Sequence, residues 1–220
     1  MGLSQRAAVL LTYYTEYLDT KNSATFVRRT SRRYTTGTLE RLLVIGPRTV
    51  RRAAALGLGL SAGYESNAVL GRALTDPDRG VRTLAEDAIR SVWCRAGNES
   101  QRQRLRSIIR ANTKQQYQLA VTRATELLRE ARRFAEVWNQ RALAHFGLRQ
   151  FVESIGDCRE TLEINPYHFG AAAGMGQCYL QLGNSASALE CFRRALRLNP
   201  GLDGVRARVQ HLERTLRNNL

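Results

Sequence analysis

Few residues of this chain have the types and spacing that acid–base, nucleophilic or metal chemistry requires. Histidine occurs only at His145, His168 and His211, and the sequence suggests no Ser-His-Asp arrangement. The four cysteines, Cys94, Cys158, Cys178 and Cys191, show no C-x2-C spacing and fit small buried residues of a reducing compartment. We therefore expect no catalytic residue, no metal and no cofactor, and a protein that binds rather than catalyses.

Two segments share features with chemical motifs but are better explained by helix structure. The segment Gly57–Gly63 is as rich in glycine as a phosphate-binding loop, which follows a β-strand and opens a helix. Here an arginine- and alanine-rich helical run precedes it, so we interpret it as a tightly packed helix end. Asp76 and Asp78 are interpreted as helix-capping residues.

Arginine dominates the charge of the chain. The formal net charge is +15, and of 34 basic residues only Lys21 and Lys114 are lysines. A strongly basic surface attracts nucleic acid, anionic lipid or acidic proteins, whereas a GC-rich genome also favours arginine codons. The densest cluster is Arg28, Arg29, Arg32 and Arg33, which helical spacing puts on adjacent faces. That cluster is either a solvated face or a nucleic-acid-binding patch, and the sequence leaves both alternatives open.

Helical periodicity runs through the chain, and no segment alternates like a β-strand. The sequence has only 4 prolines, which permits many helices. We expect helices at 6–18, at 26–34 with Asn22 or Ser23 as the cap, and at 39–45 with Thr38 as the cap. After a polar connection at 97–103, we expect a short helix at 105–110 and a longer one at 114–132. The predicted fold class is all-α.

Residues 47–96 contain an internal repeat. The residues that recur 31 positions later are Val50 as Val81, Arg51 as Arg82, Ala54 as Ala85 and Leu58 as Ile89. The segment D-P-D-x-x-V-R-x-x-A, from Asp76 onward, resembles a HEAT repeat of the bilin-lyase-like kind. Pro77 is expected to start a helix, where its missing N–H needs no partner, and Asp76 to accept from the first-turn amides. The resemblance further implies that Arg82 bonds a loop aspartate.

A second repeat has a period of 34 residues, the separation of Pro166 and Pro200. Its pattern resembles the tetratricopeptide repeat (TPR), a pair of antiparallel helices A and B. Repeats are expected at 135–168 and 169–202, with a degenerate repeat before them and a capping helix at 202–216. His145 takes a packing position of the first repeat, as a partly buried structural histidine. The matching positions are Trp138, Ala142, Gly176, Tyr179, Ala188, Phe192 and Ala195.

The TPR resemblance implies a concave groove lined by the A helices. Its polar positions are Glu136, Asn139, Gln140, Gln177 and Gln181, to which the capping helix adds Arg208, His211 and Arg214. Amide side chains both donate to and accept from a peptide backbone, and the two arginines suit a carboxylate. Ala173 stands where the family's carboxylate clamps place a lysine, so such a clamp is not expected. The small residues Gly170–Gly174 are expected to allow close packing or to leave a shallow pocket.

The organisation we expect is an α-solenoid in three segments. These are an N-terminal helical region at 1–97 with the HEAT-like repeat, connecting helices at 98–134, and the TPR repeats with their cap at 135–220. The whole is similar to uncharacterised bacterial proteins that join HEAT-like helices to a short TPR tail. No apolar run is long enough to span a membrane, so we expect a cytoplasmic protein. We expect a scaffold that binds a protein or peptide partner; the alternative is a nucleic-acid-associated protein that uses the arginines of the HEAT-like half.

Overall fold

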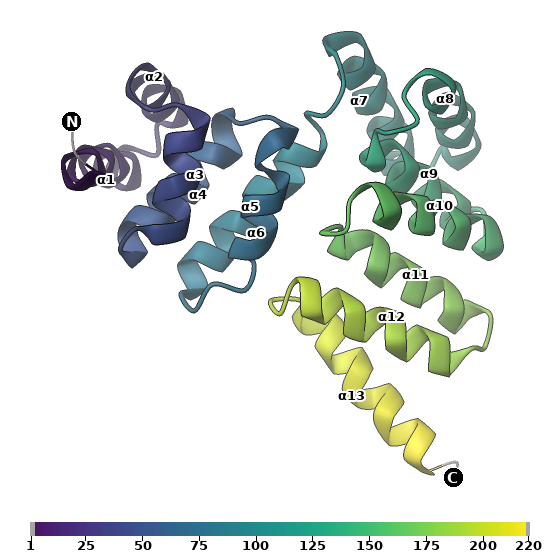
Figure 1. Cartoon of the computed structure of the whole chain (residues 1–220). Coiled ribbons are helices and arrows are strands. Elements are labelled where there is room, and N and C mark those ends of the chain that lie inside the picture. Colours follow the sequence, from purple (N-terminus) through teal and green to yellow (C-terminus); the bar gives the residue numbers. More distant parts are fainter. Residues whose placement is uncertain (1–2, 219–220) are drawn as a thin grey trace. The chain divides into compact units, whose positions relative to one another are not determined.

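All regular secondary structure of the described residues is helical, which confirms the predicted all-α class (Figure 1). The computed structural model describes residues 3–218. The helices in that range are α1 Leu3–Thr20, α2 Ser23–Arg33, α3 Thr36–Ile45, α4 Arg48–Ser61, α5 Asn67–Ala73, α6 Arg79–Trp93, α7 Glu99–Thr113, α8 Tyr117–Glu130, α9 Ala135–Gly147, α10 Phe151–Ile164, α11 Phe169–Gln181, α12 Ser185–Leu198 and α13 Asp203–Asn218, with a 3₁₀ turn at Tyr64–Ser66. Within residues 3–218, no helix combines the length and the apolarity of a membrane span.

The chain folds as two compact units, Met1–Arg95 and Ala96–Leu220. Residues 98–134, which we expected to connect two halves, therefore belong to the second unit, where they form α7 and α8.

Helix α4 is the centre of the first unit, where it packs against α1, α2, α3 and α6. Leu58 of α4 and Ile89 of α6, which are equivalent in the 31-residue repeat, are both fully buried. A Cβ added to Gly59 would stand 2.7 Å from the Cβ of Ala88. Helices α4 and α6 therefore pack so closely at this point that only glycine fits at position 59. The glycine-rich segment is thus a tightly packed helix end, as the sequence predicts.

Three helix starts differ from the sequence expectations. Thr35, not Thr38, caps α3, because its hydroxyl accepts the Thr38 amide at 3.2 Å. Asp78 caps α6 through the Val81 amide at 2.9 Å, so Pro77 lies before the cap rather than in the first turn. Helix α7 already begins at Glu99, because Asn98 and Gln101 form a capping box. Most of the polar connection expected at 97–103 is therefore helical.

The loop before α6 is held by arginines of α4. Arg51 donates two hydrogen bonds of 2.8 Å to the carboxylate of Asp76, and Arg52 donates two of 2.7 Å to that of Asp78. The hydrogen bond from Arg52 holds the pKa of Asp78 well below its usual range. Arg82 does bond a loop aspartate, as expected, but through the backbone: it donates to the carbonyls of Asp76 at 2.8 Å and Pro77 at 3.0 Å, and Arg51 occupies the Asp76 carboxylate. Asp76 accepts one loop amide, that of Asp78, at 2.8 Å.

The second unit consists of three antiparallel helix pairs and a final helix. The pairs are α7 with α8, α9 with α10, and α11 with α12, and consecutive pairs pack side by side (Figure 1). Each turn within a pair places one residue in the left-handed region: Gln115 at φ 57°, Arg149 at φ 62° and Gly183 at φ 73°. These residues are 34 positions apart, and each donates its amide to the carbonyl three residues earlier. The degenerate repeat thus has the same turn as the other two.

Candidate ligand-binding groove

The A-type helices α9 and α11 and the B-type helix α10 enclose a small, mainly apolar cavity of about 130 Å³. Its lining includes Asn139, Leu143, Phe146, Cys158, Gly170, Gly174 and Gln177. The cavity exists because two of these positions carry no side chain. A Cβ on Gly174 would meet nothing closer than the Cys158 sulfur at 3.7 Å, and one on Gly170 would meet only the His168 ring, at 3.4 Å. The small residues Gly170–Gly174 were expected either to allow close packing or to leave a shallow pocket, and the structure shows a pocket.

The cavity combines an exposed apolar residue with two amide side chains. Leu143 is 47% exposed and therefore presents apolar surface beside the cavity. Asn139 and Gln177 lie on α9 and α11. Among the described residues, the Gln177 side chain has no hydrogen-bond partner, so it can donate to and accept from a ligand.

Glu136, in contrast, is turned inward and is not part of a ligand-contacting surface. It is only 6% exposed, and one carboxylate oxygen lies 3.0 Å from Nε2 of the buried His168. The other accepts from Gln140 at 2.7 Å and from Asn139 at 3.2 Å. Burial raises the pKa of Glu136, but the His168 hydrogen bond and charge and the two amide donors outweigh it, so the pKa lies below its usual value.

Gln140 belongs to the same internal network. Its side-chain oxygen and its backbone carbonyl both accept from Asn112 of α7, at 2.9 and 2.8 Å. The network therefore ties the A helices of consecutive pairs together. Because hydrogen bonds to a buried carboxylate are lost only at a high energetic cost, Glu136 does not contact a ligand. Gln140 is half-buried, and its side chain already has partners in Glu136 and Asn112.

The remaining groove candidates lie outside the cavity. Gln181, Arg208, His211 and Arg214 are all exposed, and Arg214 donates to the carbonyl of Gln210 in its own helix at 3.2 Å. His211 occupies on α13 the position that Gln177 holds on α11, 34 residues earlier. The structure thus brings Asn139 and Gln177 to one cavity but does not bring the α13 side chains to it.

The comparisons agree with this repeat architecture. Residues 171–202 match the family model of the tetratricopeptide repeat. The matched residues cover one helix pair, most of α11 and all of α12. A TPR repeat-containing protein of Rhizobium etli is 33% identical over 86 residues, which are 39% of this chain and 42% of that protein. The Protein SGT1 homolog of Bos taurus is 32% identical over 94 residues, 43% of this chain and 28% of that protein. The chain thus spans less than half the length of either relative.

A solved TPR has the same fold. The first TPR of Spaghetti (RPAP3), bound to the HSP90 peptide SRMEEVD, matches with a TM-score of 0.52 at 18% identity, over 55% of this chain and 95% of that one. At this identity the likeness shows the fold alone. The HEAT-like character of the first unit stays a prediction.

The thiols of the TPR unit are buried. Cys158, Cys178 and Cys191 have at most 7% exposure, and burial raises the pKa of each thiol. A protonated thiol is a poor nucleophile and metal ligand. Among the described residues, no group of three or more His, Cys, Asp or Glu side chains is placed to hold a metal ion.

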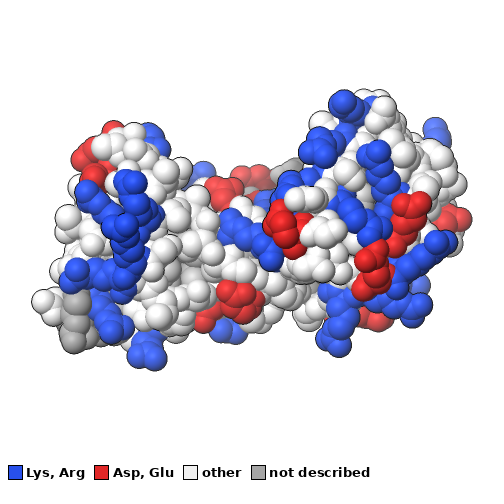
Figure 2. All heavy atoms as spheres, turned by 90° about the horizontal axis from the view of Figure 1, so that it is seen from above, with Lys and Arg blue, Asp and Glu red and all other residues white. Residues whose placement is uncertain are grey.

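The four arginines of the basic cluster on α2 are exposed, and an acidic residue neutralises the charge of one of them. Arg29 pairs with Glu16 of α1 and lies over the Tyr13 ring at 5.7 Å, and Arg28 donates to Thr25 at 3.3 Å. Arg32 and Arg33 are exposed. Figure 2 shows Lys and Arg side chains spread over both units, with Asp and Glu among them. This distribution does not single out the α2 arginines as a nucleic-acid-binding patch.

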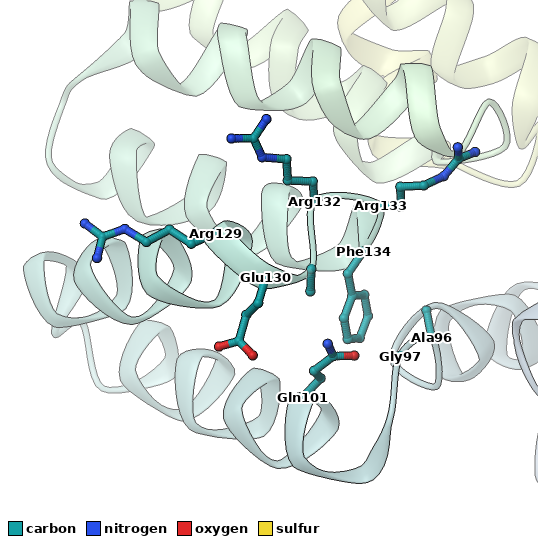
Figure 3. Close-up of a pocket in the computed structure, with 9 residues that line it drawn as sticks. Ala96, Gly97, Gln101, Arg129, Glu130, Arg132, Arg133 and Phe134 are labelled. Atoms are coloured by element: carbon teal, nitrogen blue, oxygen red, sulfur yellow. The ribbon is translucent and has the colours of Figure 1, made fainter.

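The sequence analysis did not predict two cavities at the junction of α8 and α9. One has about 500 Å³ and is lined by Gly97, Gln101, Phe134 and four charged residues of 129–133 (Figure 3). The other has about 480 Å³ and is lined by Trp138, Arg141 and Glu160, among others; Arg129 and Arg132 border both. The signal was present in the sequence, because Ala131-Arg132 stands where the next repeats have Asn-Pro.

Proposed function

We propose that the chain is a protein-interaction scaffold whose TPR groove binds an extended peptide segment of a partner protein. The observation that carries the proposal is the apolar cavity opened by Gly170 and Gly174 between α9 and α11. The peptide-bound Spaghetti (RPAP3) TPR, which shares the fold, supports it by analogy.

The size and lining of the cavity favour one aliphatic side chain as its occupant. Sites for drug-sized ligands have roughly 300–1,000 Å³, well above the 130 Å³ found here. Leu143 and Phe146 supply apolar contact, and burying one leucine- or methionine-sized side chain contributes about 1.5–3 kcal/mol. Asn139 and Gln177 at the same site offer amide groups to the backbone of the bound segment.

A glycine substitution that fills the cavity tests this function. Random peptides of about twelve residues, displayed on phage, are selected against the full chain, and the best binder is then measured by fluorescence anisotropy. Gly174→Leu places a side chain in the cavity and should weaken binding by about tenfold or more. Gly156→Leu is the matched control: a Cβ at Gly156 meets nothing within 4 Å, so affinity should stay within about twofold.

Two results would contradict the proposal. One is a set of selected peptides without a recurring aliphatic position. The other is equal affinity of wild type and Gly174→Leu, provided that circular dichroism shows both proteins folded.

A further inference from the structure

The junction between α8 and α9 departs from the rule that the other two repeat junctions follow. At those junctions a buried asparagine ends helix B and is followed by proline: Asn165 accepts the Tyr167 amide at 3.2 Å, and Asn199 accepts the Gly201 amide at 2.9 Å. At the α8–α9 junction the corresponding residues are Ala131 and Arg132. No side-chain amide closes this turn, and the two cavities open beside it.

Three arginines of this junction carry charge that the fold does not neutralise. Arg129, Arg132 and Arg133 are exposed, and within residues 3–218 none of them forms an ion pair. The other arginines nearby are paired: Arg104 bonds Glu130, and Arg141 bonds Asp157 through two contacts of 2.8 Å. The positive charge of the junction is therefore available to a ligand.

The backbone that carries these arginines is held in place. Trp138 donates its indole N–H to the carbonyl of Arg132 at 2.8 Å. The Trp138 ring is covered by the guanidinium of Arg141 at 4.8 Å, and the buried Asp157 fixes that guanidinium. A surface held in its binding conformation loses less entropy when it binds. The junction is thus pre-organised.

The arginines surround the junction rather than meeting at one point. Figure 3 shows Arg129, Arg132 and Arg133 extending in different directions, with the Phe134 ring, Gln101 and Glu130 on the side away from the Arg132 guanidinium. One small anion would reach only one guanidinium. An extended chain that presents several anionic groups would reach all three.

We propose that the α8–α9 junction binds an acidic segment of a partner protein in which Asp or Glu residues alternate with apolar residues. The carboxylates would pair with Arg129, Arg132 and Arg133. The apolar side chains would enter the two cavities, against Phe134 in one and against Leu128, Trp138 and Ile164 in the other. A nucleic acid fits less well, since an unbroken row of phosphates offers no aliphatic side chains to the apolar residues of the two cavities.

Anisotropy with the full chain tests the proposal. The probe is a fluorescein-labelled peptide of roughly twelve residues in which glutamate and leucine alternate, at about 150 mM NaCl so that distant charges are screened. The triple variant R129Q/R132Q/R133Q should bind the peptide about tenfold more weakly than wild type. The charge-matched control R110Q/R123Q/R197Q changes exposed arginines of the same unit and should stay within about twofold.

Two further arms decide between this ligand and the alternatives. A mixed-sequence single-stranded oligonucleotide of about twelve nucleotides should bind more weakly than the peptide; tighter binding that the triple variant abolishes would overturn the proposal in favour of nucleic acid. Equal losses in the triple variant and its control would also overturn it, because only net charge would then matter. Gly174→Leu should leave this affinity unchanged, which separates the junction from the groove.

Discussion

The phenyl ring of Phe192 occupies the space that a side chain on Gly176 would need. A Cβ on Gly176 of α11 would stand 2.7 Å from Cε1 of Phe192 on α12, and Phe192 itself is fully buried. The close approach of helices A and B in this repeat therefore depends on glycine at this position.

Gly176→Ala is expected to lower the free energy of unfolding by about 1–3 kcal/mol, because a rigid ring must move to admit one methyl group. Urea denaturation followed by circular dichroism measures this change. Gly174→Ala is the control. Its Cβ would meet only an ordinary contact at 3.7 Å, so stability should rise by up to about 1 kcal/mol from the better helix propensity of alanine. Equal effects of the two substitutions would refute the packing argument.

The buried Glu136 and His168 pair makes the TPR unit sensitive to acid. The folded pKa of Glu136 lies below its reference value of 4.5, so the carboxylate stabilises the fold above that pH and loses this contribution as the pH falls below it. Between about pH 5 and pH 3, the free energy of unfolding should therefore fall more steeply for wild type than for Glu136→Gln. Glu153→Gln, at an exposed position of α10, should keep the wild-type slope. The same slope in Glu136→Gln as in wild type would show that the pair does not matter for acid stability.

Asp76→Ala is expected to destabilise the first unit by about 1–3 kcal/mol. The substitution removes the two carboxylate acceptors of Arg51, whose side chain is only 18% exposed, and the acceptor of the Asp78 amide; Arg51 keeps only the carbonyl of Gly46. Asp87→Ala, at an exposed position of α6, is the control and should change stability by less than about 0.5 kcal/mol. Thermal and urea unfolding check both variants, and an unchanged midpoint in Asp76→Ala would contradict the role of the loop.

Thiol labelling should separate Cys94 from the other three cysteines. Cys94 is half-buried, whereas Cys158, Cys178 and Cys191 are buried and their thiol pKa values are raised. A disulfide reagent such as Ellman's should react with one thiol of the native protein and with the others only on unfolding. In Cys94→Ser the fast reaction should disappear. A fast reaction that persists in this variant would mean that the TPR core opens readily.

Much of the second unit was predictable because its signals are local. The 34-residue spacing of Pro166 and Pro200, with Gly183 at a turn, predicts helix pairs of fixed length, and the observed pairs follow that spacing. Asparagine before proline ends helix B wherever it occurs, since the side chain and the backbone restriction act within a few residues. Helix caps were less certain, because Thr35 and Thr38 are both good caps and only the entry of the chain into α3 decides between them.

Relationships between distant residues were decided by tertiary structure alone. On a helix wheel Glu136 and Asn139 look alike, yet Glu136 is buried because His168, 32 residues later, packs against it. Arg51 takes the carboxylate of Asp76 and leaves Arg82 the backbone carbonyl of the same residue, because α4 lies against the loop before α6. In the second unit the sequence by itself determined the pairing and order of α9 to α12, since these rest on periodicity and short-range turns. Which polar groups face a ligand and which satisfy one another depends on how consecutive helix pairs stack, and only the tertiary structure decided that.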